Sequence, residues 1–440
     1  MSIATFKGGV HPEYFKELTA SLAVTPVEPP KQVVIPMLQH IGAPCEPLVK
    51  PGDRVLVGEK IGESEAFVSA PVHATVSGEV TAVAPYAHPS GQMIEAITIE
   101  SDGEDSWEQP AAVEFDWEKL SPDEIRRRIR EAGIVGLGGA AFPAHVKLAP
   151  PEDKPIDTVI LNGAECEPYL TADHRLMLEQ PQQIVTGLLI MLKILGAGRG
   201  IIGIEDNKAD ALRVMRQEIE GRPELKVASL RTCYPQGAEK MLIEVTAGRT
   251  VPAGGLPMDV GVVNHNVGTA LAIARAVTEG RPLVERVVTV TGGGVARPAN
   301  LLVRIGTRVG DLLELCGGMK EDTGKLIIGG PMMGLSQPHP DIPVVKGTSG
   351  ITVLSDEEFE LEEATACIKC AKCVDSCPVN LLPLFLAEAA EHGLIERAEK
   401  YRAADCIECG CCSYICPARR PLTQWIRLAK AEVLKRRRQR

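Results

Sequence analysis

The sequence predicts a multidomain α/β protein, and three observations point to this fold class. Short β-type runs separated by glycine and proline fill residues 33–101, and apolar strands alternate with helical segments between residues 158 and 230. A doubled cysteine pattern lies among short helical segments between residues 367 and 417. With 440 residues, of which 45% are hydrophobic and 24% charged, the chain has the length of about three domains with buried cores.

The N-terminal part divides into a proline-containing segment and a small β module. Residues 1–30 are expected to form an arm or linker. Residues 31–103 contain the runs VVIPM, GDRVLVGEKIG and MIEAITIE, and the stretch 52–83 resembles the barrel-sandwich fold of lipoyl and biotinyl carriers. In those carriers a lysine lies at the hairpin tip, whereas the tip here, residues 63–66, reads ESEA. We therefore expect a structural module that docks against a neighbour.

Residues 104–284 are expected to form an α/β domain. A helix is predicted to begin after Ser121, because this N-cap is followed by Pro122 and two acidic residues. Beyond it, strands at 158–161, 200–204 and 226–230 alternate with helices at 183–195 and 209–221. This alternation predicts a partly parallel, Rossmann-like sheet, although the usual dinucleotide motif G-x-G-x-x-G is missing after the first strand.

Two stretches of this domain have features of a ligand site. The run GLGGAAFP at residues 136–143 can bring backbone N–H groups close to a phosphate or a flat ring. Glycine-rich turns are common, so the run is a weak indicator when taken alone. The strand at 158–161, however, ends in NGAECEP, at the position where α/β sheets place their ligand contacts.

Eight of the thirteen cysteines form two copies of the pattern C-x2-C-x2-C-x3-C-P. This spacing is typical of a pair of [4Fe–4S] clusters, in which the fourth cysteine of each copy ligates the other cluster. Structural zinc would use C-x2-C pairs, and disulfides would need an oxidising compartment. We assign one cluster to Cys367, Cys370, Cys373 and Cys416, and the other to Cys406, Cys409, Cys412 and Cys377. Cys411 lies off the pattern and is expected not to be a ligand.

The segment that carries the cysteines, residues 355–440, is expected to be a helical ferredoxin domain. Helices are predicted at 381–392 and 394–401, separated by Gly393, and from Arg420 to the end. The apolar residues expected to shield the clusters from water are Leu381, Leu384, Leu386 and Ile395.

Charge and hydropathy limit the function classes. The net charge is −11 and aromatic residues make up only 4%, which argues against a nucleic-acid-binding protein. The N-terminus has no apolar core of signal-peptide length, and the most apolar window, residues 184–204, contains Lys193 and Arg199. We expect a cytoplasmic protein with peripheral membrane association. The basic run at 435–440 has two open explanations, the dipole of a terminal helix and docking to an anionic membrane.

Four segments resemble, in order, the FMN- and NADH-contacting segments of the flavin subunit of respiratory complex I. They are GLGGAAFPAHVK at 136–147, NGAECEP at 162–168, YPQGAE at 234–239 and NHNVGT at 264–269. With the β module in front and the double cluster behind, the whole chain resembles the C-type subunits of Rnf-type ion-translocating electron-transport complexes. Residues 285–354 are then similar to the soluble-ligand-binding β-grasp domain of complex I and are expected to be a scaffold. Three positions, Ala164, Ala238 and Gly268, lack acids that complex I has, which affects nicotinamide binding more than flavin binding.

The resemblance implies a peripheral subunit of a ferredoxin:NAD⁺ oxidoreductase on the cytoplasmic face of the cell membrane. FMN would link the hydride chemistry of NAD(H) to the one-electron chemistry of the two clusters, and partner subunits, including a ferredoxin-type one, would couple it to ion translocation. Its implied cofactor residues are Gly136, Gly138 and Gly139 for backbone contact with the flavin, Lys147 for its phosphate or ring oxygens, Asn162, Glu165, Glu239 and Asn266 for its edge, and Glu167 for the nicotinamide nucleotide.

Two other functions remain open from the sequence. A soluble cobalamin reductase of the microcompartment type resembles the chain from the glycine run onward, but typically begins there. A structural adaptor with a relict flavin fold would dock a ferredoxin domain to a membrane complex. The β module at residues 33–101 favours the membrane-complex subunit. Cys166 is expected to be a packing residue, because no histidine lies near it in the sequence.

Overall fold

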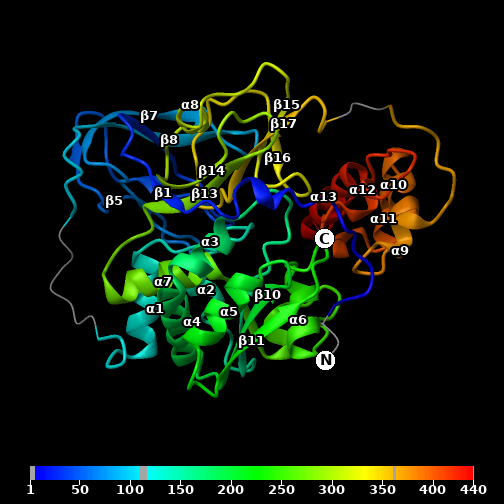
Figure 1. The fold of residues 1–440 in the computed structure, drawn as a ribbon, viewed down its shortest axis with the longest axis horizontal. Helices are drawn as coiled ribbons and strands as arrows, with labels where there is room; N and C mark the ends of the chain where they lie inside the picture. The colour runs from blue at the N-terminus through cyan, green and yellow to red at the C-terminus, as the bar shows by residue number, and fades with distance from the viewer. Residues whose placement is uncertain (1–4, 109–115, 360–362, 440) are drawn as a thin grey trace.

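The computed structural model describes residues 5–108, 116–359 and 363–439. Figure 1 shows the α/β domain in green, with the two β-rich modules, in blue and yellow, beside one another along one side of it. The helical C-terminal domain, in orange and red, lies to one side of the α/β domain. Within the described ranges, no helix is both long and apolar enough to cross a membrane.

The first β module consists of two small antiparallel sheets. One has the strand order β2-β8-β7-β4 and the other β3-β5-β6. Val33, Ile35, Ile61 and Ile97 are fully buried between them, so the alternating runs of the sequence supply a common core. The strands are β2 (Gln32–Pro36), β3 (Glu46–Pro47), β4 (Arg54–Val55), β5 (Lys60–Glu63), β6 (Val72–His73), β7 (Gly78–Ala87) and β8 (Met93–Ser101).

The α/β domain contains a four-stranded sheet with the order β11-β10-β9-β12, and all its neighbours are parallel. The strands are β9 (Thr158–Gly163), β10 (Arg199–Glu205), β11 (Leu225–Leu230) and β12 (Val262–Asn266). The three strands predicted at 158–230 are thus present, and β12 joins them at the edge beside β9. Parallel strands place all four carboxyl ends at one edge of the sheet.

Helices cover both faces of this sheet. The helix predicted after Ser121 is confirmed, and the Ser121 hydroxyl and the Glu124 carboxylate form a reciprocal capping box. The core on one face joins α1, α3, α4, α5 and α7, while α6 packs on the other face. The helices are α1 (Pro122–Glu131), α2 (Ala144–Lys147), α3 (Ala172–Glu179), α4 (Pro181–Leu195), α5 (Ala209–Glu218), α6 (Glu239–Ala247) and α7 (Val267–Thr278).

The second β module is a mixed sheet of six strands, in the order β1-β14-β13-β17-β15-β16. Its first strand comes from the predicted N-terminal arm, because residues 24–26 pair in parallel with residues 300–302. The Asn300 side chain holds the preceding turn by donating to the carbonyls of Thr19 and Leu22. The elements are β1 (Val24–Pro26), β13 (Glu285–Thr291), β14 (Ala299–Arg304), α8 (Val309–Leu315), β15 (Thr323–Ile328), β16 (Leu335–Gln337) and β17 (Gly350–Ser355).

The C-terminal domain is helical, as predicted. Gly393 adopts a left-handed conformation (φ 67°) just after α10, where the sequence indicated a break. Leu381 and Leu386 are buried in the core of this domain and Leu384 packs against it, but Ile395 is only half-buried outside that core. The helices are α9 (Lys372–Asp375), α10 (Pro383–Glu391), α11 (Ile395–Lys400), α12 (Cys411–Tyr414) and α13 (Leu422–Gln439).

Candidate functional site

The carboxyl edge of the parallel sheet brings the predicted flavin segments together. Asn162 lies next to the last residue of β9, Asn266 ends β12, and the two residues are direct partners across the strands. The glycine run lies against this pair, because a Cβ atom on Gly138 would lie 2.9 Å from Cβ of Asn266. Segments that are distant in the chain therefore meet at one point through the sheet topology.

The three glycines of the run have different environments. Gly138 has no room for a side chain unless Asn266 moves. Gly139 has a φ of +142°, and a Cβ atom there would meet nothing within 4 Å, so its backbone borders open space. A Cβ atom on Gly136 would make only ordinary contacts, at 3.7 Å. Steric arguments thus explain a glycine at 138 and 139 and give no reason for one at 136.

Lys147 and Glu239 form an ion pair at this edge. The Lys147 ammonium, at the end of α2, donates to the Glu239 carboxylate at 2.5 Å, and Glu239 is the first residue of α6. Both side chains remain partly exposed, 26% for Lys147 and 37% for Glu239. The predicted cation and one predicted acid are therefore neighbours that a ligand can still reach.

Both asparagines hold backbone around the site. The Asn162 amide donates to the Gly237 carbonyl at 2.8 Å and accepts from the Ala164 N–H, which joins the YPQGAE and NGAECEP segments. The Asn266 side chain caps α7 by accepting from the Gly268 N–H at 2.8 Å and donates to the Asp173 carboxylate.

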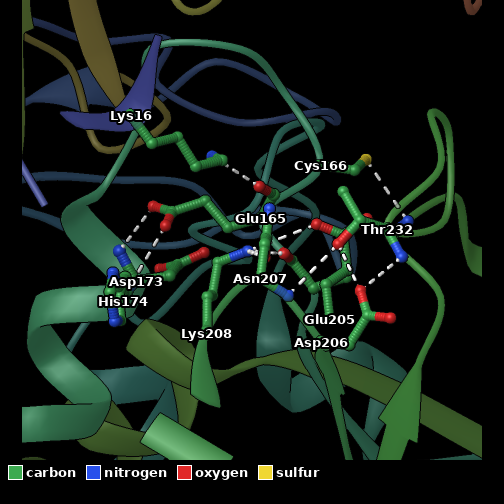
Figure 2. Close-up of polar contacts among 12 residues, drawn as sticks. Lys16, Glu165, Cys166, Asp173, His174, Glu205, Asp206, Asn207, Lys208 and Thr232 are labelled. Carbon is green, nitrogen blue, oxygen red and sulfur yellow. Dashed lines mark hydrogen bonds and ion pairs between the residues drawn. The ribbon is translucent and has the colours of Figure 1, made fainter. Parts of the chain in front are cut away.

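The carboxylates of Glu165 and Glu167 have partners within the protein. Glu165 accepts from the N–H groups of Asp173 and His174 at the start of α3 (Figure 2). Glu167 accepts from the N–H groups of Met332 and Met333 in the second β module, at 3.1 and 2.8 Å. Burial raises the pKa of Glu167 to about 7, against the lowering effect of these hydrogen bonds. Contact of these two carboxylates with flavin or nicotinamide stays a prediction.

Several buried polar atoms beside these segments have no partner among the described residues. They are both ring nitrogens of His145, both amide atoms of Gln236, Oδ1 of Asn264 and Nε2 of His265. An unpaired buried polar atom costs about 1–3 kcal/mol, so a ligand rich in donors and acceptors fits this edge. Burial, followed by the charge of Lys147, holds the pKa of His265 well below its usual value, so this ring is neutral. The sequence analysis did not single out any of the four residues, although all of them belong to its quoted segments.

Two buried lysines support the NGAECEP loop, Lys208 from below and Lys16 from above in the view of Figure 2. Lys208 donates to the carbonyl of Ala164 at 2.7 Å and to the carboxylate of Glu205. Lys16 donates to the carbonyls of Glu165, Glu167 and Leu170 at 2.8, 3.0 and 2.6 Å. Within the same loop, the Cys166 sulfur accepts from the Gly237 N–H, and burial raises the pKa of its thiol, which fits the packing role expected of it.

The two cysteine copies have the same backbone conformation. Left-handed residues occur at three equivalent positions in each copy: Lys369 and Glu408, Ala371 and Gly410, and Asn380 and Arg419. In each copy the backbone N–H of the left-handed residue two positions after the first cysteine donates to its sulfur at 3.4 Å. Such N–H donors stabilise thiolate ligands, so both loops fit a cluster.

The surroundings of the thiols are compatible with the predicted crossed ligation. Cys377 of the first copy lines one small cavity of about 20 Å³ together with Cys406, Cys409, Cys411 and Cys412 of the second. Cys416 and Cys367 lie close enough to Cys373 for their charges to raise the pKa of its thiol, after the larger effect of burial. Among the described residues, no three histidine, cysteine or acidic side chains are arranged so that they could hold a metal ion. The assignment of the cluster ligands therefore stays a prediction.

Tyr234 connects the α/β domain with the second cysteine copy. Its ring is buried, and its hydroxyl donates to the carbonyl of Cys409 at 2.8 Å. The Cys411 thiol lies 3.8 Å from the Tyr234 carbonyl, and Tyr234, Cys166, Cys409 and Cys411 share one small apolar core. This position explains why Cys411 is buried without belonging to the cysteine pattern.

Comparisons with known proteins agree with this architecture. Models of four domains match the chain: the RnfC barrel sandwich hybrid domain at residues 4–104, the Nuo51 FMN-binding domain at 129–275, the SLBB domain at 287–336 and a 4Fe-4S dicluster domain at 366–419. They confirm the predicted fold class, with its FMN domain and its domain for two [4Fe–4S] clusters.

Relatives that match nearly the whole chain are also found. The chain is 49% identical to the C-type subunit of the proton-translocating ferredoxin:NAD⁺ oxidoreductase complex of Clostridium ljungdahlii, covering 98% of this chain and 94% of that protein. It is also 49% identical to the C-type subunit of the Na⁺-translocating complex of Acetobacterium woodii, covering 99% and 98%. A solved NAD⁺-reducing [NiFe]-hydrogenase chain matches 64% of this chain and 54% of its own length, with 20% identity and a TM-score of 0.47.

Proposed function

The chain belongs to the RnfC family, the C-type subunits of ion-translocating oxidoreductase complexes, and from this premise we propose that it passes electrons between NAD(H) and ferredoxin-linked partners. In this function it is a peripheral subunit on the cytoplasmic face of the membrane, and the other subunits of the complex translocate the ion. When bound, FMN supplies the conversion between hydride transfer and the single-electron steps of [4Fe–4S] clusters.

The observation that carries the proposal is the contact made by Tyr234. This residue belongs to one candidate flavin segment, and its hydroxyl is bonded to the backbone of Cys409, a predicted ligand of the second cluster. This contact supports a two-electron flavin site and a one-electron cluster site that lie next to one another in one chain. A cobalamin reductase would not need the module at residues 4–104, and a relict fold gives no reason for unpaired buried polar atoms at Gln236 and His265.

The residues that would hold FMN are those of the sheet edge. The backbone at Gly139 borders open space, and Lys147 supplies the positive charge that a phosphate or a ring oxygen requires. Asn162 and Asn266 keep the surrounding loops in place. The eight pattern cysteines would hold the two clusters, and the apolar side chains that line the cavity beside the second cluster keep water away from it.

The environments of the two cysteine copies support an order of electron transfer. The second copy lies against the α/β domain and the second β module, where a Cβ atom on Gly410 would be 3.0 Å from the Met332 carbonyl. In the first copy, Cys367 and Cys370 are exposed and the Ile368 side chain between them is 67% exposed. The second cluster therefore exchanges electrons with the flavin, and the first exchanges them with a partner.

The proposal is tested with anaerobically reconstituted protein. We expect FMN, about eight iron atoms per chain and reduction of both flavin and clusters by NADH. In Cys377→Ala the second cluster should be damaged, so iron falls towards about half and NADH reduces the flavin but not the first cluster. Cys411→Ala is the matched control, since it removes a buried thiol that lines the same cavity but lies off the cysteine pattern, and it should keep all iron. The proposal fails if the wild type binds no FMN, and the crossed ligation fails if Cys377→Ala keeps both clusters unchanged.

A further inference from the structure

The N-terminal arm contacts both halves of the proposed electron path. Figure 1 shows it running, in blue, along the side of the C-terminal domain before it reaches β1. The Gly9 N–H donates to the Ser376 carbonyl at 2.9 Å, next to Cys377. Val10 and Tyr234 exchange backbone hydrogen bonds in both directions, at 2.8 and 2.9 Å. The arm therefore lies where the α/β domain meets the C-terminal domain, which carries the two cysteine copies and is called the cysteine domain below.

A few residues later the arm follows the NGAECEP loop and its extension. The Tyr169 N–H donates to the Tyr14 carbonyl at 2.7 Å, and the ring of Phe15 stacks on the ring of Tyr169, with 4.7 Å between centroids. The hydroxyls of Thr19 and Thr171 are hydrogen-bonded at 2.7 Å. Residues 14–19 and residues 165–171 therefore contact each other along their whole length, in what we call the arm–loop interface.

Lys16 lies at the centre of the arm–loop interface, and each of its three N–H donors makes a hydrogen bond. A lysine ammonium has three N–H donors, and three loop carbonyls, those of residues 165, 167 and 170, accept from it within 3.0 Å. Figure 2 shows its side chain reaching the backbone of Glu165 from above the sheet edge. An apolar residue at position 16 would remove the donor from the buried carbonyl of Leu170 and from the partly buried carbonyls of Glu165 and Glu167, which is costly.

Keeping the Lys16 ammonium charged in this buried position costs free energy, because the charge is removed from water. Burial, followed by the charge of the second buried lysine, Lys208, lowers the pKa of Lys16 to about 8, although Glu165, Glu205 and Cys166 favour the charged form. Lys208 supports the same loop at the carbonyl of Ala164. The loop is thus held by one lysine from its own domain and one from the arm.

We propose that Lys16 is a positioning residue of the flavin site, through which the arm fixes the 162–170 loop while its Gly9–Val10 segment fixes the contact with the cysteine domain. Lys16 does not touch the flavin in this role; it sets the loop that begins with Asn162. This inference rests on the proposed function, since the loop is important to redox chemistry only if FMN binds there. It adds that FMN affinity depends on a residue 149 positions away from Glu165 in the sequence.

The first test is titration of FMN into flavin-free, cluster-containing protein, with the quenching of flavin fluorescence as the readout. Lys16→Met keeps the apolar stem and removes all three donors, so we expect the dissociation constant to rise about tenfold or more. Iron content should not change, because the three hydrogen bonds of Lys16 go to carbonyls of the flavin loop. Lys7→Met is the matched control, an exposed lysine of the same arm, and should bind FMN like the wild type.

The second test is the pH profile of the same titration, which a merely space-filling side chain would not change. Above a pH of about 8 the neutral amine of Lys16 keeps two N–H donors for three carbonyls. The FMN affinity of the wild type should therefore fall between about pH 7 and about pH 9, and it should fall more steeply than that of Lys16→Met across this range. The other titratable groups that face Lys16, namely Lys208, Glu165, Glu167, Asp173, Glu205 and Cys166, are present in both proteins, so the difference between the two profiles reports Lys16.

The outcomes separate this inference from the proposed function. Wild-type protein that binds no FMN contradicts both. Lys16→Met protein that keeps its iron and secondary structure and binds FMN as tightly as Lys7→Met overturns the positioning role alone. If Lys16→Met loses its iron or its fold, the wild-type pH profile decides, and an affinity that is constant through about pH 8 overturns the inference.

Discussion

At the scale of single residues, several predicted ligands also have structural roles. Asn266 caps α7 and Glu165 receives the first N–H groups of α3, so both residues are needed for the local fold whether or not they meet a cofactor. Substitution of either residue would mix folding and binding effects. Gly138 is a cleaner probe, because its role is the space that it leaves free beside Asn266.

We predict that Gly138→Val weakens FMN binding at least about tenfold, because the added carbons would displace the Asn266 side chain or occupy the cofactor's space. The measurement is flavin content and NADH-dependent dye reduction at unchanged iron content. Gly198→Val is the control, since a Cβ atom at this exposed glycine meets nothing within 4 Å. Full flavin content and dye reduction in Gly138→Val would mean that the flavin binds elsewhere.

At the scale of elements, the basic C-terminal helix has two distinct parts. Arg427 and Lys430 both bind the Glu408 carboxylate, at 2.7 and 2.8 Å, and Lys430 also donates to the Cys406 carbonyl. This half of α13 therefore holds the loop of the second cluster. In the other half, Arg437 pairs with Glu399 at the surface, where such a pair contributes little to stability.

Deletion of residues 435–440, the last of which lies outside the described residues, separates these two parts. NADH-to-dye activity should be unchanged, because Arg427 and Lys430 remain. Binding to anionic vesicles or native membranes should weaken at moderate salt, since each basic residue near such a surface contributes about 1 kcal/mol. Co-sedimentation measures this binding. If the truncated protein sediments with membranes as well as the untruncated chain does, protein–protein contacts anchor it instead of the tail.

At the scale of the whole molecule, the domains are joined by buried polar contacts as well as by apolar ones. Glu167 ties the NGAECEP loop to the turn at Met332 and Met333, which in turn lies against Gly410 of the cysteine domain. Three domains thus meet near the carboxyl group of Glu167.

We predict that this junction becomes less stable as the pH rises. The pKa of Glu167 is raised from 4.5 to about 7, so the folded protein holds a proton that the unfolded chain releases at lower pH. Stability is therefore lost as the pH rises from about 4.5 to about 7, by at most about 3 kcal/mol. The neutral variant Glu167→Gln should escape this loss, and its Tm relative to the wild type should increase between about pH 5 and about pH 8.

Glu65→Gln, at an exposed carboxylate of the first β module, is the control for this experiment and should follow the wild-type profile at every pH. Thermal unfolding followed by circular dichroism gives the Tm values. Parallel profiles of Glu167→Gln and the wild type would show that the carboxyl group titrates at an ordinary pKa and that the junction does not depend on its protonation.

The sequence by itself determined the features that depend on neighbouring residues. The capping box at Ser121, the strands β9 to β11, the break at Gly393 and the cysteine pattern all follow from spacings of a few residues, and so could be predicted. The order of the modules was also readable, through the resemblance of short segments. What these local patterns leave open is which distant segments come into contact.

Only the tertiary structure decided those contacts. It assigned residues 24–26 to an edge of the second β module, gave Glu167 a partner 165 positions away, and brought Tyr234 to Cys409 and Lys16 to the NGAECEP loop. The physical reason is that a buried lysine or carboxyl group is stable only where the fold supplies enough hydrogen-bonding partners. Those partners are backbone groups, which no side-chain pattern in the sequence reveals.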